Sequence, residues 1–173
     1  MTHCGHSKRD ANLAIMKGKV AIGIAFAVQL ISGCSVSMPV SEATARPLSN
    51  SEVALIGDHP SVRGKWFEVN VSLSRASASK IPRWELYTHI RVTDCDNGRT
   101  VSIVSPARVE GTEGDFGRLR SLLRSNIQRQ TFVLNGPAFF QEGQSMQGLC
   151  VRIEGGSYTL QKIVSDNVPL ILT

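Results

Sequence analysis

The sequence lacks an apolar run long enough to cross a bilayer, and it lacks the short motifs by which many enzymes are identified. Its longest apolar run, Val20 to Ile31, has twelve residues, whereas a membrane-spanning helix needs about 20. There is no phosphate-binding loop, dinucleotide fingerprint, His-Glu-x-x-His motif, paired Cys-x-x-Cys motif or Gly-x-Ser-x-Gly elbow. We therefore expect no cofactor and no metal site.

Strong charge of one sign is also missing from most of the chain. The whole sequence carries a net charge of +5, but four basic residues and one acidic residue lie among the first 33. The remainder has a net charge of about +2. Binding to a nucleic acid usually needs a concentrated basic surface, so we expect no nucleic-acid partner.

The apolar run lies near the start of the chain and ends abruptly at Cys34. Lys17 and Lys19 precede it, and a basic flank before about 7–15 apolar residues is typical of a secretory signal. The alternative is a buried helix of the folded domain. Gly23, Gly33 and the Ser/Pro-containing segment that follows disfavour that alternative.

The residues Ile31-Ser32-Gly33-Cys34 resemble the lipobox of bacterial lipoproteins. The resemblance covers Lys17 to Cys34, and it implies cleavage before Cys34 and attachment of lipid to its sulfur and new amine. Two or three acyl chains would hold the protein on a membrane. Ser35 follows where an Asp would favour the inner membrane in enteric bacteria, so the resemblance favours the outer membrane, with the inner membrane as the alternative. Met16 is an alternative start to Met1.

Composition divides the chain into three parts. Residues 1–33 are the expected signal peptide. Residues 34–51 are small, polar and proline-containing, which predicts a lipidated N-terminus followed by a flexible tether. Residues 52–173 are long enough to bury a core and predict a single globular domain.

Two cysteines, Cys95 and Cys150, follow the expected lipidation site. In an exported protein a cysteine pair most simply forms a disulfide. Two unpaired thiols are the alternative. A metal site is not expected, because no further Cys or His lies at close ligand spacing to either residue.

Alternation of apolar and polar residues predicts several strands. Phe67 to Ser74 alternates cleanly, which is typical of a strand with one buried face. Arg75 to Pro82 is predicted to be a loop. Glu85–Asp94 and Thr100–Ser105 flank an Asn-Gly dipeptide, which predicts an antiparallel hairpin with a type I′ turn. Further strands are predicted at 131–140, 148–154 and 158–164, with turns at Asn135-Gly136-Pro137 and Glu154-Gly155-Gly156.

One segment changes to a helical period. Phe116, Leu119, Leu122, Leu123 and Ile127 recur on one stripe, which predicts an amphipathic helix over about 115–129. Its expected start carries the spacing of a capping box, Thr112 to Asp115. The fold class that follows is mainly β, an antiparallel sandwich with one amphipathic helix; the alternative is α+β.

Two histidines are candidates for catalysis. His59 lies between Asp58 and Ser61, but a catalytic triad depends on geometry and not on sequence neighbours, so we interpret the segment as a polar loop. His89 lies on the polar face of a predicted strand beside Tyr87. It is expected to face solvent or to pair across strands.

Two clusters of polar residues are candidate ion-binding sites. Asp94, Asp96 and Asn97 could offer oxygens to calcium, but turn chemistry already accounts for them. The basic side chains of the predicted helix could bind an anion, but they flank its apolar stripe as expected for the edge of a core. They are Arg118, Arg120, Arg124 and Arg129.

These observations favour a periplasmic lipoprotein that binds an envelope protein and catalyses no reaction. Roles that fit are a subunit of an envelope machine, a secretion accessory, an inhibitor or an immunity protein. The first alternative is a cell-envelope hydrolase that uses His59 or His89. The second is a carbohydrate-binding module, for which the sequence offers only two Trp as stacking platforms.

Overall fold

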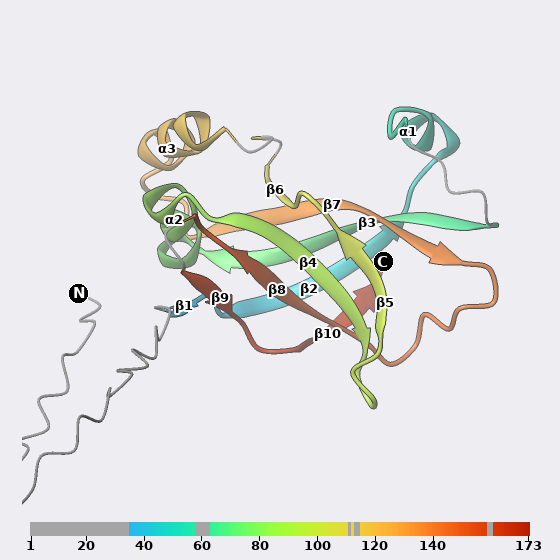
Figure 1. The fold of residues 1–173 in the computed structure, drawn as a ribbon. Coiled ribbons are helices and arrows are strands. Elements are labelled where there is room, and N and C mark those ends of the chain that lie inside the picture. Colours follow the sequence, from blue (N-terminus) through green and yellow to red (C-terminus); the bar gives the residue numbers. More distant parts are fainter. Residues whose placement is uncertain (1–34, 58–62, 111, 113–114, 159–160) are drawn as a thin grey trace, which may run out of the picture.

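The computed structural model describes residues 35–57, 63–110, 112, 115–158 and 161–173. Within these residues the chain is mainly β, as the sequence predicts (Figure 1). The strands are β1 (Ser35–Ser37), β2 (Val40–Pro47), β3 (Gly64–Ser74), β4 (Tyr87–Asp94), β5 (Thr100–Val104), β6 (Arg108–Val109), β7 (Thr131–Gln141), β8 (Leu149–Gly156), β9 (Lys162–Val164) and β10 (Val168–Leu172). The helices are α1 (Asn50–Ala54), α2 (Arg75–Trp84) and α3 (Phe116–Ser125).

The strands form two layers that share β10 (Figure 1). One layer contains β1, β9, β8, β4 and β5, and the other contains β2, β3, β7 and β6. β10 pairs antiparallel with β8 through Val168 and Pro169, and then parallel with β2 through Leu170 to Leu172. The β1–β9 pair is also parallel, whereas the other strand pairs are antiparallel. The result is a mixed sheet that turns a corner at β10.

The opposite side of the molecule is closed by the segment between β5 and β6. The Ala107 amide donates to the Thr88 carbonyl of β4 at 2.9 Å, and the Thr88 hydroxyl donates to the Ala107 carbonyl at 3.2 Å. Beyond Ala107, β6 pairs with β7. Hydrogen bonds therefore connect the two layers on both sides, and the sandwich is a flattened barrel.

Side chains that alternate inward along the strands fill the space between the layers. In β3 the inward residues Val69, Val71 and Leu73 are fully buried, as the sequence predicts. In β4 the inward residues Ile90 and Val92 are fully buried as well. Burial of each such side chain contributes roughly 1.5–3 kcal/mol, so this inner face is the main source of stability.

The prediction of a loop over Arg75–Pro82 is wrong, because this segment lies in α2. The Ser74 hydroxyl caps the helix by accepting a hydrogen bond from the Ser77 amide at 3.1 Å. Glu85 ends it in a left-handed conformation with φ 50°. The helix buries Ala78 and Ile81, a stripe too short to show in the sequence pattern.

The predicted helix over about 115–129 is present as α3 but is shorter. Asp115 is its N-cap, and the carboxylate accepts from the Arg118 amide at 2.9 Å, so the expected capping box from Thr112 does not form. Arg75 of α2 closes the other end of α3: its guanidinium donates to the carbonyls of Leu123 and, at 2.6 Å, Asn126. No helix in the described part of the chain is long and apolar enough to cross a membrane.

The prediction of a flexible tether is also wrong, because this segment forms strands of the sheet from Ser35 onward. β1 pairs with β9, and β2 lies between β10 and β3. Met38, Ala43 and Ala45 are buried in the core. Its small, polar and proline-containing composition, without apolar periodicity, made this segment resemble a linker. The folded domain therefore includes residues 35–51 and does not begin at Glu52.

Two expected turns lie inside strands. Asn135-Gly136-Pro137 is part of β7 and pairs with β3 along its whole length, and Glu154-Gly155-Gly156 is part of β8. Gly136 is needed in β7 because a Cβ there would overlap Val104 of β5. Gly155 has φ +139° and a Cβ there would overlap the Tyr87 carbonyl. β10 was not expected.

The hairpin and the disulfide are both confirmed. β4 and β5 pair antiparallel around residues 95–99, although of the two central residues only Gly98 has positive φ, so the turn is not type I′. Cys95 in this turn is bonded to Cys150 of β8, with 5.1 Å between the Cα atoms. The bridge ties the hairpin to the neighbouring strand.

Candidate binding groove

An open groove of about 700 Å³ lies on the outer face of β3 and β7. One wall is α1 with the residues beside it, and the other is the chain from β5 to β6. We call it the Trp66 groove. It is lined by Leu48, Glu52, Leu55, Ile56, Trp66, Glu68, Ile103, Ser105, Pro106, Arg108, Pro137 and Phe139.

Strand alternation explains why large apolar side chains face outward here. Trp66-Phe67 in β3 and Phe139-Phe140 in β7 are adjacent aromatic pairs, so one ring of each pair must lie on each face. Phe67 and Phe140 point inward and pack edge to face. Trp66 and Phe139 are opposite each other in register and pack outside, with ring centroids 5.3 Å apart. They form the floor of the groove.

The walls add apolar side chains that have little cover. Leu55, just after α1, is 87% exposed, and Ile103 of β5 is 47% exposed. Pro106 and Pro137 complete the apolar lining. A volume of about 300–1,000 Å³ is typical of ligand sites, and this groove has polar as well as apolar walls.

A charged network fixes the position of α1 relative to the sheet. Arg46 of β2 donates to Glu52 of α1 at 2.7 Å and to Glu68 of β3 at 2.9 Å. The hydrogen bond from Arg46, with further ones from Ser49, lowers the pKa of Glu52 to about 2. The pKa of Arg46 is raised, chiefly by its hydrogen bond with Glu52. The groove therefore has a carboxylate-rich side, where Arg46 offsets one of the two negative charges of Glu52 and Glu68.

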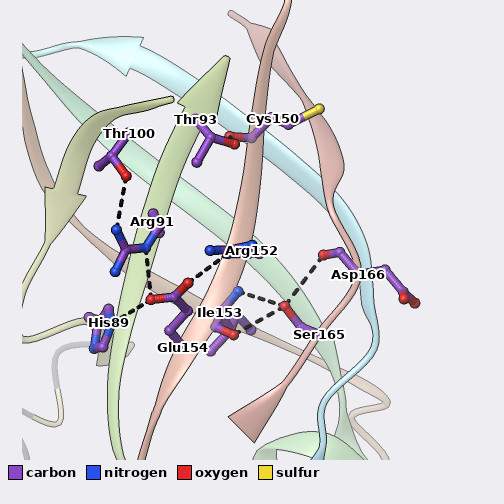
Figure 2. A network of polar contacts seen from close by, with 10 residues as sticks. All are labelled: His89, Arg91, Thr93, Thr100, Cys150, Arg152, Ile153, Glu154, Ser165 and Asp166. Carbon is purple, nitrogen blue, oxygen red and sulfur yellow. Dashed lines mark hydrogen bonds and ion pairs between the residues drawn. The ribbon is translucent and has the colours of Figure 1, made fainter. Parts of the chain in front are cut away.

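A second polar cluster lies on the outer face of the other layer and contains His89 (Figure 2). Glu154 of β8 accepts from Arg91 of β4 at 2.7 Å and from Arg152 at 2.6 Å, and its other contact is His89 Nε2 at 3.2 Å. Partial burial alone would raise the pKa of Glu154. The hydrogen bonds from Arg91 and His89 and the charge of Arg152 outweigh it, so the pKa is lowered.

This arrangement places His89 in a cross-strand ion network. Glu154 could orient an imidazole for proton transfer, but it is held at the same time by two guanidinium groups. Arg91 in turn donates to the Thr100 hydroxyl at 2.9 Å. His89 therefore pairs across strands, as the sequence analysis expected.

The remaining predicted site residues do not converge on one place. Cys34 and His59 lie outside the described residues. The Asp94 carboxylate accepts from the amides of Asp96 and Asn97 at 2.9 and 3.3 Å, and these bonds hold its pKa below the usual range, with the Asp96 amide as the main cause. Among the described residues no cluster of three or more His, Cys, Asp or Glu is placed to hold a metal ion.

Two arginines of the predicted helix, Arg120 and Arg129, have separate partners. Arg120 donates to the Pro82 carbonyl at 2.6 Å and lies 3.7 Å from Glu85. Arg129, beyond the end of α3, donates to Glu110 at 2.7 Å. The structure thus brings these groups to the junction of α2, α3 and β7 and not to one anion site.

No motif in the sequence indicates the Trp66 groove. Its residues come from four stretches of the chain, 48–56, 66–68, 103–108 and 137–139. The one local signal was the pair of adjacent aromatics in each of two neighbouring strands, which forces a ring outward from both.

Comparisons with protein-family models, curated proteins and solved structures find no match to this chain.

Proposed function

We propose that this protein is a lipid-anchored component of the bacterial cell envelope that binds another envelope protein and catalyses no reaction. The pattern Ile31-Ser32-Gly33-Cys34 after a basic flank and a short apolar run supports lipidation of Cys34. The same resemblance favours the periplasmic face of the outer membrane, with the inner membrane as the alternative. The observation that carries the binding role is the Trp66 groove.

The chemistry of the groove favours an apolar segment of a protein as its occupant. Exposed aliphatic side chains of Leu55 and Ile103 flank an aromatic floor. Clustered Trp and other large apolar residues are typical of the centres of protein interfaces. Glu52 and Glu68 share the guanidinium of Arg46, so the polar side forms a charged rim beside the apolar floor. We therefore expect apolar anchors of the partner to enter between α1 and the Ser105–Pro106 segment.

Site-specific photocrosslinking in cells tests this role. A photoreactive amino acid at Leu55 should crosslink to one envelope protein, which is then identified and purified. The same probe at Ile127, which is 70% exposed and outside the groove, is the matched control. Crosslinks of equal strength from both positions would contradict a specific groove.

Affinity for the purified partner gives the quantitative test. Leu55→Ser and Ile103→Ser should each weaken binding about tenfold or more, since each removes an apolar contact worth about 1–2 kcal/mol. Ile127→Ser should leave binding unchanged. If groove variants and the control bind equally, the groove is not the binding site.

Substitution of the two candidate histidines distinguishes the binding role from the hydrolase alternative. If the protein is a binder, His89→Ala and His59→Ala should leave binding and the cellular phenotype intact. Loss of all function in His89→Ala, with folding and partner binding preserved, would support the hydrolase instead. Binding of soluble envelope oligosaccharides that is abolished by Trp66→Ala would support the carbohydrate-binding alternative.

Anchoring is tested by intact mass. The mature protein should begin at Cys34 and carry the mass of acyl chains. Cys34→Ala should remain uncleaved by the lipoprotein signal peptidase. Normal maturation of that variant would contradict lipidation.

A further inference from the structure

The register of the sheet places Ser35, the first residue that the structure describes, beside an aromatic cluster. Ser35 of β1 is opposite Lys162 of β9, Lys162 is opposite Gly156 of β8, and Gly156 is opposite Tyr87 of β4. Neighbouring strands lie about 4.8 Å apart. Ser35 and Tyr87 are therefore separated by three strand spacings, roughly 14 Å, along one end of the layer.

Exposed aromatic side chains gather at this end. Tyr158 is 86% exposed and packs edge to face against Tyr87, with ring centroids 5.3 Å apart. Tyr87 also contacts Phe116 of α3 at 5.7 Å between centroids. Trp84, the last residue of α2, is 38% exposed. Rings that are apolar at one side and polar at the other are enriched where proteins meet the headgroup region of a bilayer.

Basic side chains lie at the same end. Lys80 of α2 donates to the Ser37 carbonyl of β1 at 2.6 Å, which fixes α2 beside the start of the domain. The Arg83 guanidinium lies 5.3 Å from the centre of the Trp84 ring, and Lys162 is exposed on β9. Glu85, which lies 3.7 Å from Arg120, and Asp115, the N-cap of α3, are acidic neighbours. Lysine and arginine beside aromatic rings suit a surface of lipid phosphates.

We propose that this end of the domain rests on the headgroup region of the membrane that holds the lipid anchor. The inference rests on the proposed lipidation of Cys34. Cys34 is bonded directly to Ser35, and Ser35 is already paired in the sheet, so one peptide unit of about 3.8 Å separates the lipidated residue from the fold. The anchor would therefore be attached directly to β1, because Ser35 is the first residue of that strand. The membrane is therefore the surface that covers Trp84, Tyr87 and Tyr158.

The same geometry directs the Trp66 groove away from the membrane. β3 runs from Trp66 near one end of the molecule to Ser74, where α2 begins. Eight residues of strand span roughly 26 Å. Figure 1 shows α1 and α2 at opposite ends of the sheet. A domain seated on the α2 end would hold the groove open toward a partner.

The fluorescence of the two tryptophans of the sequence can therefore report on the two ends of the domain, Trp66 at the groove end and Trp84 at the α2 end. The experiment uses the mature, lipidated protein in vesicles of phosphatidylethanolamine and phosphatidylglycerol, with bromine-labelled acyl chains as the quencher. Trp66→Phe leaves Trp84 as the reporter, and Trp84→Phe leaves Trp66. We expect the emission of Trp84 to fall as the bromine content rises, and the emission of Trp66 to stay constant.

A further variant tests the contact itself. Tyr158→Ser in the Trp66→Phe background should reduce the quenching of Trp84, because it removes the most exposed ring of the docking end. Leu55→Ser in the same background, at the groove end, should leave the quenching unchanged. Circular dichroism of each variant checks that the fold is retained.

The outcomes separate the two proposals. Mass spectrometry of the vesicle sample first shows whether Cys34 carries acyl chains. Acylated protein in which neither tryptophan, or both equally, is quenched would overturn the docking proposal and leave the anchor standing. Protein without acyl chains would overturn the anchor and, with it, the docking that depends on the anchor.

Discussion

Gly136 of β7 lies directly against Val104 of β5, so that a Cβ added at Gly136 would overlap Cγ1 of Val104. Val104 is fully buried. This is the side on which the chain passes from one layer to the other before β6 joins β7. The close approach explains why a glycine occupies the middle of a long strand, where it would otherwise cost stability.

We expect Gly136→Ala to lower the free energy of unfolding by about 1–3 kcal/mol, because the methyl group overpacks the site. Val104→Ala alone should cost about 2 kcal/mol by leaving a cavity. The double variant should be less destabilised than the sum of the two, since the smaller Val104 side chain makes room for the new methyl group. Urea unfolding of the four proteins measures this, and strict additivity would contradict the contact.

The disulfide gives a second prediction. Cys95 and Cys150 are 55 residues apart in the chain, and closing a loop of that size stabilises a domain by roughly 4 kcal/mol in the loop-entropy description. Reduction should therefore shift urea unfolding to clearly lower denaturant. A Cys95→Ala, Cys150→Ala double variant should match the reduced protein and show no response to reductant. Equal stability with and without the bridge would contradict this expectation.

Regular spacing of large apolar side chains predicted the strands and the helix in which such side chains recur. The inner faces of β3 and β4, the hairpin to β5 and the start of α3 follow from such patterns. Prediction failed where a segment has few large apolar residues and no regular spacing between them. Met38 and Ile81 are buried but isolated, and their buried neighbours Ala43, Ala45 and Ala78 are small, so these segments resembled a tether and a loop.

The candidate groove could not be predicted for a different reason. Its residues meet only after β2, β3, β5 and β7 have been brought together, and no local pattern records which strands become neighbours. Trp66 was available as a single outward aromatic in β3, but its partner Phe139 is 73 residues later in the sequence. The cross-strand register that pairs them is a property of the fold.

The ion network around Glu154 predicts a dependence of stability on pH. Its pKa in the folded protein lies below the ordinary value of 4.5. A carboxyl group whose pKa is lowered by folding stabilises the protein above the unfolded pKa and loses this contribution as pH falls through the folded value. Glu154→Gln should therefore cost roughly 1–2 kcal/mol at pH 7, and the difference from the native protein should shrink below about pH 4.5.

Urea unfolding at a series of pH values between 7 and 3 measures this difference. Glu42→Gln, at an exposed position of β2, is the control for removing one carboxylate. A loss of stability in Glu154→Gln that grows as the pH falls would contradict this predicted pH dependence. Salt should reduce the penalty only in part, because Glu154 is 22% exposed and is screened less than a surface pair.

The last prediction concerns the segment that the sequence presents as a tether. Met38 follows β1, is fully buried, and its amide donates to the Val164 carbonyl at 2.9 Å. In a flexible tether, truncating this side chain would change the stability of the domain very little. In the structure, Met38→Ala removes a core side chain and should lower the free energy of unfolding by about 2–5 kcal/mol.

Glu42→Ala is the matched control in the same segment, because Glu42 is exposed on β2; it should change the stability by no more than about 0.5 kcal/mol. Hydrogen exchange provides an independent measurement. Thr44 and its neighbours in β2 pair with β10 on one side and β3 on the other, so amides of this strand should exchange as slowly as those of β3. Rapid exchange over 40–47, together with a negligible effect of Met38→Ala, would mean that the segment is a tether after all. In that case the anchor would no longer lie beside the aromatic end of the domain.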